Sequence, residues 1–336
     1  MSFYIGVDGG GTKTAFSLFD ENKNVVKTVY GPGSNHENLE GAFDEASAVI
    51  WNGITELVGE AGISLDDVAF SLMGLAGIDH QFQHDIMCEK LSEKGLRNFA
   101  IYNDGFIVVQ AGSESGAAIG YNCGTGTCCT AIDSKGNMLQ LGGLSECTGD
   151  MGNGNWIAQT AFRLIYDEVY LGLEPTLITK MYYDAFGITS REEFVGTVAK
   201  LETEEAPLYI KTLIGSFFKA AAMGDAPALA KTDEMAKRGA QFIAALAKQM
   251  EFDGDEIEVV LFTGRYSREK CHKVLIDAVA LTRDPGRIKL VFAGCAPLDE
   301  KLHEYAQQMS GRKLKFIKLD KEPVTGCINW IFRQYK

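Results

Sequence analysis

The sequence predicts an α/β protein built from two similar halves. Short apolar segments with strand character alternate with segments whose apolar residues recur at helical spacing, which is typical of an α/β fold with a partly parallel sheet. A second observation is a pattern of strand, glycine-rich turn and strand that occurs near the N-terminus and again in mid-chain. The chain has 336 residues, more than a single core usually supports, so two domains are expected.

The first glycine-rich turn follows an apolar strand that ends at Asp8 and precedes a second strand over residues 14–19. The turn consists of Gly10, Gly11, Thr12 and Lys13. Glycines let the backbone approach a ligand closely, and successive N–H groups in such a turn can bind an anion. Asp8 is placed to hold Mg²⁺, directly or through water, because Mg²⁺ prefers oxygen ligands. A plain hairpin with a glycine-rich turn is the alternative.

The second copy of this pattern covers residues 118–127. Its turn consists of Gly124, Thr125, Gly126 and Thr127. Gly6 and Gly10 align with Gly120 and Gly124 at one constant offset, and both copies lead into an apolar strand that ends in a polar turn. Two such turns in a duplicated layout favour two phosphate-binding hairpins that face one nucleotide across a cleft.

The remaining elements follow from apolar periodicity and from turn residues. In the first half the expected order is a strand over 25–30, a turn-rich loop over 31–36, a helix from 39 to about 58, a strand over 68–75, a helix over about 81–94, a strand over 99–102 and a buried helix over 106–111. For the last segment, β-branched residues leave a strand as a real alternative.

The second half is expected to begin near Gly116. Its predicted order is hairpins to about 141, a glycine-rich loop over 142–154, helices from about 156 to 250 with breaks near 187 and 224, a strand over 258–262, and strands over 288–292 and 315–318 with a helix between them. Pro323 opens a last helix, because proline is tolerated in a first turn.

Composition excludes several classes of protein. The formal net charge is −13 and there is no basic stripe, which argues against nucleic acid and anionic membranes as partners. No apolar run approaches the ~20 residues of a membrane helix, and the N-terminus lacks a signal-peptide layout, so a cytoplasmic location is expected. The eight cysteines form no Cys-x-x-Cys pair, so reduced thiols are expected and zinc is not.

Ligands of open α/β sheets bind beyond the carboxyl ends of the strands, a rule that selects Asp8, Gly74, Asp104 and Gly264. Asp104 follows a short strand and could take the proton from an attacking hydroxyl group in phosphoryl transfer. The alternative is that Asp104 caps the next helix. Gly264 would let an adenine or a ribose lie against the chain; a helix C-cap or an ordinary turn is the alternative.

Other polar loop residues are candidates for recognising a substrate. Asp150 could accept hydrogen bonds from substrate hydroxyl groups or could cap the helix that follows. Asn35 and His36 suit polar substrate recognition, or are surface turn residues. His36 is not expected to bind a metal, because no second histidine has ligand spacing.

These motifs occur together in an order that resembles one family. They are residues 6–13, 31–35, 74–77, 103–104, 124–127, 142–143, 149–150 and 323–326. Their spacing is similar to that of the N-acetylglucosamine kinase / BadF-BadG-BcrA-BcrD ATPase family, within the actin, hexokinase and heat-shock-ATPase superfamily. The resemblance implies an actin-like ATPase fold, in which two ribonuclease-H-like domains flank a nucleotide cleft. The first would comprise residues 1–115 plus 322–336, and the second residues 116–321 with a helical insertion.

The resemblance also implies roles for matching positions. The nucleotide site would contain Gly10, Gly11, Thr12, Lys13, Gly124, Thr125, Gly126, Thr127, Gly215, Gly264 and Arg265, with Thr12 and Thr125 contacting phosphate. Asp8 would be linked to Mg²⁺, and Asp104 would be the catalytic base. The substrate site would contain Asn35, His36, Asn103, Asp104, Cys128, Gly143, Leu144, Ser145 and Asp150.

Three positions depart from the pattern of the sugar kinases in this family. Cys128 stands where they carry an asparagine that contacts the sugar, Leu144 replaces a tryptophan, and Met151 replaces a glutamate. Specificity rests on paired buried polar groups, so the loss of a polar contact changes which sugar is accepted. The phosphate-binding residues are present, and the identity of the substrate is left open.

The leading hypothesis is an ATP- and Mg²⁺-dependent kinase of a sugar or amino sugar, with N-acetylglucosamine or a glucosamine-like compound as substrate. Family analogy makes a homodimer plausible. One alternative is an ATPase that drives electron transfer with an iron–sulfur cluster between two subunits. Cys123 and Cys147 suggest it, although the second hairpin lacks the acidic, glutamine-containing turn of such activators. A non-catalytic sensor of sugar or nucleotide is the third hypothesis.

Overall fold

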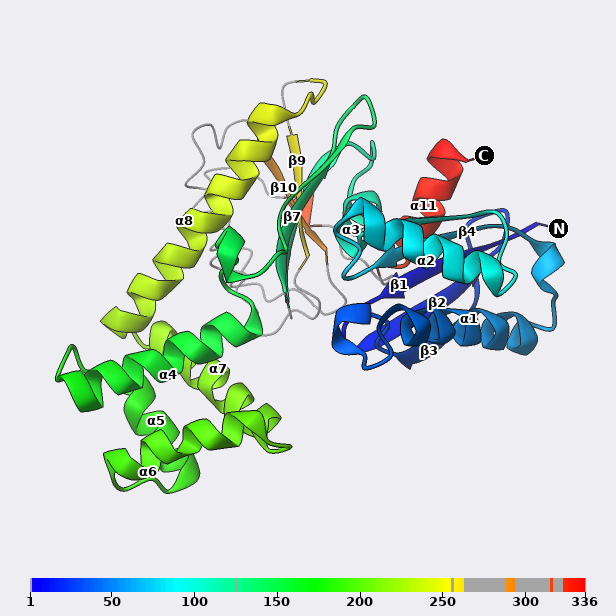
Figure 1. Ribbon diagram of the computed structural model, residues 1–336. Coiled ribbons are helices and arrows are strands. Elements are labelled where there is room, and N and C mark those ends of the chain that lie inside the picture. The colour runs from blue at the N-terminus through cyan, green and yellow to red at the C-terminus, as the bar shows by residue number, and fades with distance from the viewer. Residues whose placement is uncertain are drawn as a thin grey trace.

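The computed structural model describes residues 2–124, 126–254, 257–262, 288–293, 315–316 and 323–335. They form two β-sheets, one of five strands and one of six, together with a group of helices that extends from the second sheet (Figure 1). The α/β class predicted from the alternation of strands and helices is confirmed. Within the described residues, no helix is both long enough and apolar enough to cross a membrane.

The first sheet has the strand order β3-β2-β1-β4-β5. Its strands are β1 (Phe3–Gly9), β2 (Lys13–Phe19), β3 (Val25–Pro32), β4 (Val68–Leu75) and β5 (Phe99–Tyr102). The first three strands pair in antiparallel fashion, and β4 and β5 add to β1 in parallel. The carboxyl ends of β1 and β4 therefore lie side by side, with Asp8 paired to Gly74.

The second sheet repeats this arrangement with the order β11-β10-β9-β6-β7-β8. Its strands are β6 (Ala118–Cys123), β7 (Thr127–Ile132), β8 (Met138–Gly142), β9 (Ile257–Phe262), β10 (Ile288–Ala293) and β11 (Lys315–Phe316). Again an antiparallel meander comes first, and parallel strands then add to its first strand. The duplication inferred from the sequence is thus present in the topology.

The turns at the far ends of the two meanders are also alike. Asp20 Oδ1 accepts hydrogen bonds from the backbone N–H groups of Asn22 and Asn24, both at 2.8 Å. Asp133 Oδ1 accepts from the backbone N–H groups of Lys135 and Asn137, at 2.9 and 2.8 Å. In each turn the asparagine side chain donates to the other carboxylate oxygen at 3.0 Å. The same local chemistry therefore closes both hairpins.

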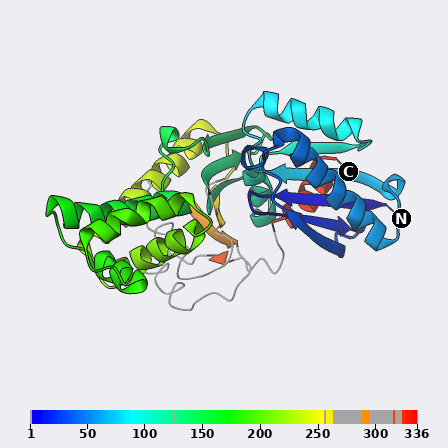
Figure 2. The ribbon, with the colours of Figure 1, turned by 60° about the horizontal axis from the view of Figure 1, so that its bottom comes forward.

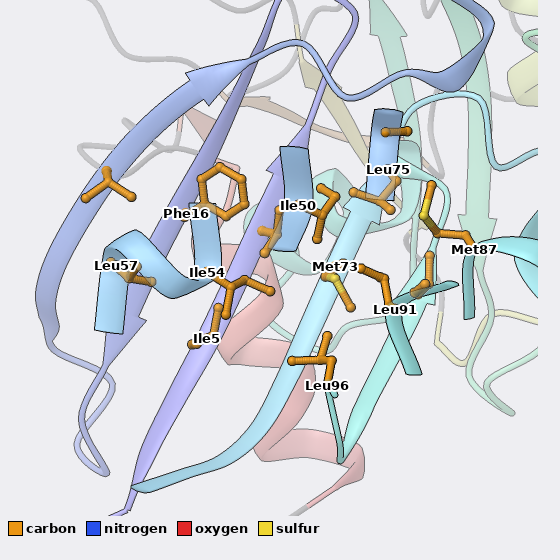
Figure 3. Close-up of a cluster of buried hydrophobic side chains, with 14 of the residues drawn as sticks. Ile5, Phe16, Ile50, Ile54, Leu57, Met73, Leu75, Met87, Leu91 and Leu96 are labelled. Carbon is orange, nitrogen blue, oxygen red and sulfur yellow. The ribbon is translucent and has the colours of Figure 1, made fainter. Parts of the chain in front are cut away.

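Helices α1 (Ala42–Ala61) and α2 (Gln81–Glu93) cover the outer face of the first sheet (Figure 3). Ile50, Ile54 and Leu57 recur at helical spacing on α1 and are fully buried against Ile5 and Phe16. Each such side chain contributes roughly 1.5–3 kcal/mol through removal of apolar surface from water. This periodicity is why the segment folds as a helix on this face.

Helix α3 (Asp104–Gly112) lies between the two sheets (Figure 1). Glycines allow its close approach to the second sheet: a Cβ atom on Gly105 would lie 2.6 Å from Thr130 Cγ2, and one on Gly112 would lie 2.3 Å from Val260 Cγ1. On the first sheet, a Cβ atom on Gly74 would lie 2.7 Å from Ile107 Cδ1. A helix that is apolar all round suits such a doubly covered position.

The last helix, α11 (Thr325–Gln334), returns to the first sheet and to α3. A Cβ atom on Gly326 would lie only 2.0 Å from the backbone oxygen of Ile107, so the two helices meet at backbone distance. The predicted domain boundary at 115/116 falls between α3 and β6 and stays a prediction.

A body of packed helices extends from the second sheet (Figure 2). They are α4 (Gly154–Leu171), α5 (Leu177–Phe186), α6 (Arg191–Gly196), α7 (Ala206–Ala222) and α8 (Ala226–Gln249). The last of them, α8, is shared, because Phe242, Ile243 and Leu246 pack against the second sheet.

Most expected elements are confirmed, one alternative is wrong, and two bounds differ in detail. Residues 106–111 are helical, so the strand alternative is wrong: Asn103 caps the segment, and burial on all sides suits a helix. Gly31 and Pro32 extend β3 instead of opening a loop, and the first helix begins at Ala42. The helix expected between β10 and β11 lies outside the described residues.

Replacement of Gly326 by alanine tests the contact between α11 and α3. Because the new methyl group would meet backbone atoms that cannot turn away, we expect Gly326→Ala to lower the free energy of unfolding by about 1–3 kcal/mol or more. Gly59→Ala on α1 is the matched control, since a Cβ atom there meets no atom of the described residues within 4 Å and alanine favours helix by up to ~1 kcal/mol. Urea unfolding measures both, and equal stabilities would contradict the packing described.

Candidate functional site

Asp104 stands at the start of α3, where the first sheet meets the second. Strand β5 ends at Tyr102, and Asn103 caps the helix by accepting a hydrogen bond from the Gly105 N–H group at 2.9 Å. The alternative that Asp104 is the helix cap is therefore wrong, because the neighbouring asparagine has that role. Asp104 is the first helical residue, and it is half-buried.

The surroundings of Asp104 favour its protonated form. Burial is the main cause that raises the pKa of its carboxyl group from 3.8 to about 7, and the negative charges of Asp8 and Asp79 raise it further. The N–H group of Gly105 acts in the opposite direction. A carboxyl group with a pKa near 7 suits general-base chemistry, since the best catalytic pKa lies near the working pH.

Asp79 belongs to this site, although the sequence analysis did not select it. It lies in the loop between β4 and α2, and its Oδ1 atom accepts hydrogen bonds from Asn103 Nδ2 at 3.0 Å and from Gln140 Nε2 at 2.6 Å. Burial raises the pKa of the Asp79 carboxyl group, and the bond from Gln140 opposes this. The sequence analysis considered residues at the carboxyl ends of strands, which here are residues 74–77. Asp79 lies just beyond the turn that follows, so that rule did not select it.

Cys128 and Gly143 form the wall of the site on the second sheet. Cys128 lies on β7, and a Cβ atom on Gly143 would lie 3.2 Å from Cys128 Cβ and 3.9 Å from Asp79 Oδ1. Burial raises the pKa of the Cys128 thiol well above its ordinary range, and the charges of Asp104, Asp79 and Asp150 add to this. The side chain is thus an uncharged thiol and no nucleophile.

Asp150 organises the loop that carries Gly143, Leu144 and Ser145. Its Oδ2 atom accepts from the backbone N–H groups of Gly143 at 2.9 Å and Ser145 at 3.0 Å, and its Oδ1 atom accepts from Thr148 Oγ1 at 3.0 Å. Asp150 does not cap α4.

That cap is Asn153, whose Oδ1 atom accepts from the Trp156 N–H group at 2.9 Å. Within the loop, Leu144 and Ser145 are exposed. Ser145 has a φ of 94°, a strained value of the kind that functional loops retain.

Asn35 and His36 lie beside the loop that leads to Asp79. Gly77, with a φ of +81°, leaves room for Asn35, since a Cβ atom there would lie 2.3 Å from Asn35 Oδ1. His36 is only 8% exposed and stacks on Phe43 at 3.9 Å, so the surface alternative is wrong for this residue. Burial lowers the pKa of His36, and its Nδ1 atom is buried without a hydrogen-bond partner among the described residues.

The first glycine-rich turn is held by its neighbours on both sides. The Gly10 N–H group donates to Lys13 O at 3.0 Å, and Ser34 N–H donates to Gly10 O at the same distance. Thr12 and Lys13 are exposed, and the ammonium group of Lys13 lies 5.4 Å from the ring centre of Tyr30. Gly11 is half-buried beneath the loop that follows β3.

The second glycine-rich turn adjoins the helical body. Cβ atoms on Gly124 and Gly126 would meet no atom of the described residues within 4 Å. Gly154 N–H donates to Gly124 O at 3.2 Å, and a Cβ atom on Gly154 would lie 3.6 Å from Ile214 Cδ1. Gly215 follows Ile214 on α7, and no contact between Gly215 and this turn occurs among the described residues.

The remaining residues predicted for the nucleotide site are either buried or outside the described part of the chain. Thr127 is buried, and its hydroxyl group donates to Met151 O at 3.0 Å. Thr125, Gly264 and Arg265 lie outside the described residues.

The residues near Asp104 could bind Mg²⁺ only if substrate phosphates and water molecules supplied the remaining ligands. No cluster of three or more acidic, histidine or cysteine side chains within the described part of the chain could hold a metal ion. Asp8 alone offers a carboxylate at the end of β1, close enough to Asp104 for its charge to act there. Mg²⁺ is usually bound by one or two carboxylates, substrate phosphates and waters, and this residue set fits that mode.

Two matching sheets that enclose a buried α3, with glycine-rich turns at equivalent hairpins, define an actin-like ATPase fold of two ribonuclease-H-like units. The chain belongs to the BadF/BadG/BcrA/BcrD ATPase family, whose model matches residues 5–283. The resemblance seen in the sequence motifs is thereby confirmed, and membership of an ATPase family implies that the protein uses ATP.

Individual relatives are more distant. An N-acetylmuramic acid/N-acetylglucosamine kinase of Clostridium acetobutylicum is 26% identical over 200 residues, which span 59% of this chain and just under two thirds, 64%, of that protein. An N-acetyl-D-glucosamine kinase of Dictyostelium discoideum is 24% identical over 274 residues, 78% of this chain and 84% of that protein.

A solved structure named as an N-acetylglucosamine kinase, from Chromobacterium violaceum, has the same fold. Its TM-score with this chain is 0.63 at 19% identity, over 92% of this chain and 99% of that one. At this identity the likeness concerns the fold alone.

Substitution of Asp104 by asparagine should stabilise the metal-free protein in a pH-dependent way. Near pH 4 the carboxyl group of Asp104 is largely protonated in the folded chain, whereas in the unfolded chain, where its pKa is 3.8, it is already more than half ionised. Between about pH 4 and pH 7 the folded chain keeps the Asp104 proton, whereas the unfolded chain releases it. The free energy of unfolding therefore falls as pH rises through this range, and the loss is complete above pH 7. Asp104→Asn removes that loss, so its thermal midpoint should exceed that of the wild type increasingly from pH 4 to 8.

Asp20→Asn provides a control of opposite sign. Hydrogen bonds from Asn24 lower the pKa of Asp20, so its ionised form stabilises the folded state above the unfolded pKa of 3.8. The variant should therefore be less stable than the wild type by a nearly constant amount from pH 4 to 8. Thermal unfolding at pH 4, 6 and 8 measures both variants. A constant difference between Asp104→Asn and the wild type would contradict the burial of this carboxyl group.

Proposed function

We propose that the protein transfers the γ-phosphoryl group of ATP to a hydroxyl group of a sugar or amino sugar, with N-acetylglucosamine or a glucosamine-like compound as acceptor. The observation that carries the proposal is Asp104, a half-buried carboxyl group with a pKa of about 7. It lies between two related lobes: the first lobe is built on the five-stranded sheet and the second lobe on the six-stranded sheet. The kinase names of the two relatives above support the choice of acceptor.

In this reaction Asp104 accepts the proton of the acceptor hydroxyl group as the hydroxyl oxygen attacks the γ-phosphorus atom. A phosphorus–oxygen bond to the acceptor forms, the bond between the γ-phosphorus and the bridging oxygen breaks, and ADP leaves. Asn103 holds Asp104 at the start of α3. The backbone N–H groups of both glycine-rich turns, with Thr12, Lys13 and Thr125, would bind the phosphates.

Asp8 is the residue that would hold Mg²⁺, which neutralises charge on the phosphates when bound. Gly215, Gly264 and Arg265 are assigned to the nucleoside side of ATP. The binding site of the acceptor sugar is assigned to Asn35, His36, Gly143, Leu144, Ser145 and Asp150. A cytoplasmic location and a homodimer remain predictions of the same hypothesis.

A direct assay tests this proposal. The purified protein is incubated with ATP, Mg²⁺ and a panel of hexoses and hexosamines, and sugar phosphate is measured by mass spectrometry. Loss of the general base in Asp104→Asn should lower kcat about 10²–10⁴-fold, while the shift in thermal midpoint produced by ATP is kept. The proposal fails if the wild type phosphorylates no member of the panel, or if Asp104→Asn retains more than about a tenth of kcat.

Asp8→Asn tests the assignment of the Mg²⁺ position. Because the amide lacks the negative charge of a carboxylate, the Mg²⁺ concentration that gives half-maximal activity should rise by about tenfold or more. Asp20→Asn, at the opposite end of the same hairpin, should leave this concentration unchanged. A Mg²⁺ titration of the phosphorylation rate measures both, and an unchanged titration for Asp8→Asn would remove Asp8 from the metal site.

A further inference from the structure

The side chain of Asp79 touches both lobes. Through Oδ1 it accepts from Asn103, the cap of α3, at 3.0 Å, and from Gln140 on β8 of the second sheet at 2.6 Å. Asn103 directly follows β5 of the first sheet, and Gln140 lies on β8 of the second sheet, 37 positions further along the sequence. One oxygen atom therefore joins the two halves of the site.

The backbone of Asp79 is itself held in place. The N–H groups of Asp79 and His80 both donate to Gln83 Oε1 at 2.8 Å, and Gln83 is 5% exposed at the start of α2. The Asp79 side chain therefore extends from a fixed point of the first lobe. Its two hydrogen bonds restrict the positions of the Asn103 and Gln140 side chains.

Each bond leads to a different part of the proposed machinery. The Asn103 amide that donates to Asp79 also uses its oxygen to accept from Gly105 N–H at 2.9 Å, which fixes the turn of helix where Asp104 stands. Gln140 precedes Gly142 on the same strand, donates to Gly142 O at 3.3 Å, and so holds the beginning of the loop that carries Gly143.

We propose that Asp79 is a positioning residue that couples the orientation of Asp104 in the first lobe to the position of the 142–150 loop in the second. This inference rests on the proposed function, in which Asp104 is the base and the loop contacts the acceptor. Bonds to a charged acceptor atom are stronger than neutral ones, so a single carboxylate can hold both amides. Neither amide touches the reacting atoms through this contact, and Asp79 acts through them.

Two substitutions separate the two bonds. Gln140→Ala removes the bond to the second lobe and leaves the bond between Asp79 and Asn103, whereas Asp79→Ala removes both. Asp133→Asn is the matched control. Asp133 is a buried, hydrogen-bonded aspartate at the other end of β8, and its bonds stay within the second lobe.

Amide hydrogen exchange of the ligand-free protein measures the coupling between the start of α3 and the 142–150 loop without requiring catalysis. Gln140→Ala should speed exchange about tenfold in the segment 138–149 and leave the segment 104–109 as in the wild type. Asp79→Ala should speed both segments, and Asp133→Asn should leave 104–109 unchanged. If Asp79→Ala does not fold, Asp79→Asn, which keeps the shape and loses the charge, should show the same pattern with smaller changes.

Steady-state kinetics then show what the coupling does. Gln140→Ala should raise KM for the acceptor about tenfold with kcat within about twofold, since the loop is displaced and the base is not. Asp79→Ala should raise KM and also lower kcat at least tenfold. A purely structural role would lower kcat in proportion to the folded fraction and leave KM unchanged.

The two failures are distinguishable. Exchange that rises in only one segment for Asp79→Ala, or equally for Asp133→Asn, overturns the positioning role whatever the enzyme does. Absence of any sugar phosphorylation by the wild type overturns the proposed function, while the exchange pattern still decides whether Asp79 couples the lobes.

Discussion

The packing of α3 between the two sheets is the constraint on which the rest of the structure depends. The helix can approach the second sheet so closely because Gly105 and Gly112 carry no side chain where Thr130 and Val260 stand. On its other side, Ile107 fills the space left by Gly74, and Gly326 brings α11 against its backbone. Interiors packed to this density transmit displacement, so a change in the relation of the lobes must pass through α3.

This position explains why ionising Asp104 is costly, and it is the reason why the proposed reaction assigns the general base to this residue. A helix enclosed by two sheets places its first residue where water is partly excluded, and burial then raises the pKa of the carboxyl group. The neighbouring charges of Asp8 and Asp79 act in the same direction. A carboxyl group whose pKa is raised to near neutral in this way lowers folding stability at neutral pH, and in the proposed function this loss is exchanged for a general base.

Local patterns in the sequence were enough to predict the strands but not the partners of polar side chains. The bounds of β4 and β5 agree with the apolar runs that predicted them, because strands buried in a sheet leave a continuous signal. Capping was the alternative considered for Asp104 and Asp150, whereas Asn103 and Asn153 have that role. Asp79 and Gln140 could not be predicted, since their bond joins residues of different sheets and leaves no periodic trace.

The polar groups around Asp104 are largely engaged with one another, and this bears on how an acceptor would be chosen. The Asp150 carboxylate already accepts from three donors of its own loop, and Asn103 is bonded to Asp79 and to the backbone. Cys128 adds a thiol, which is a weak donor and a weak acceptor. Selection between similar sugars by hydrogen bonding at this wall would therefore be weak. It follows that the shape of the wall at Cys128 and Gly143, and the geometry by which a hydroxyl group reaches Asp104, would carry most of the discrimination.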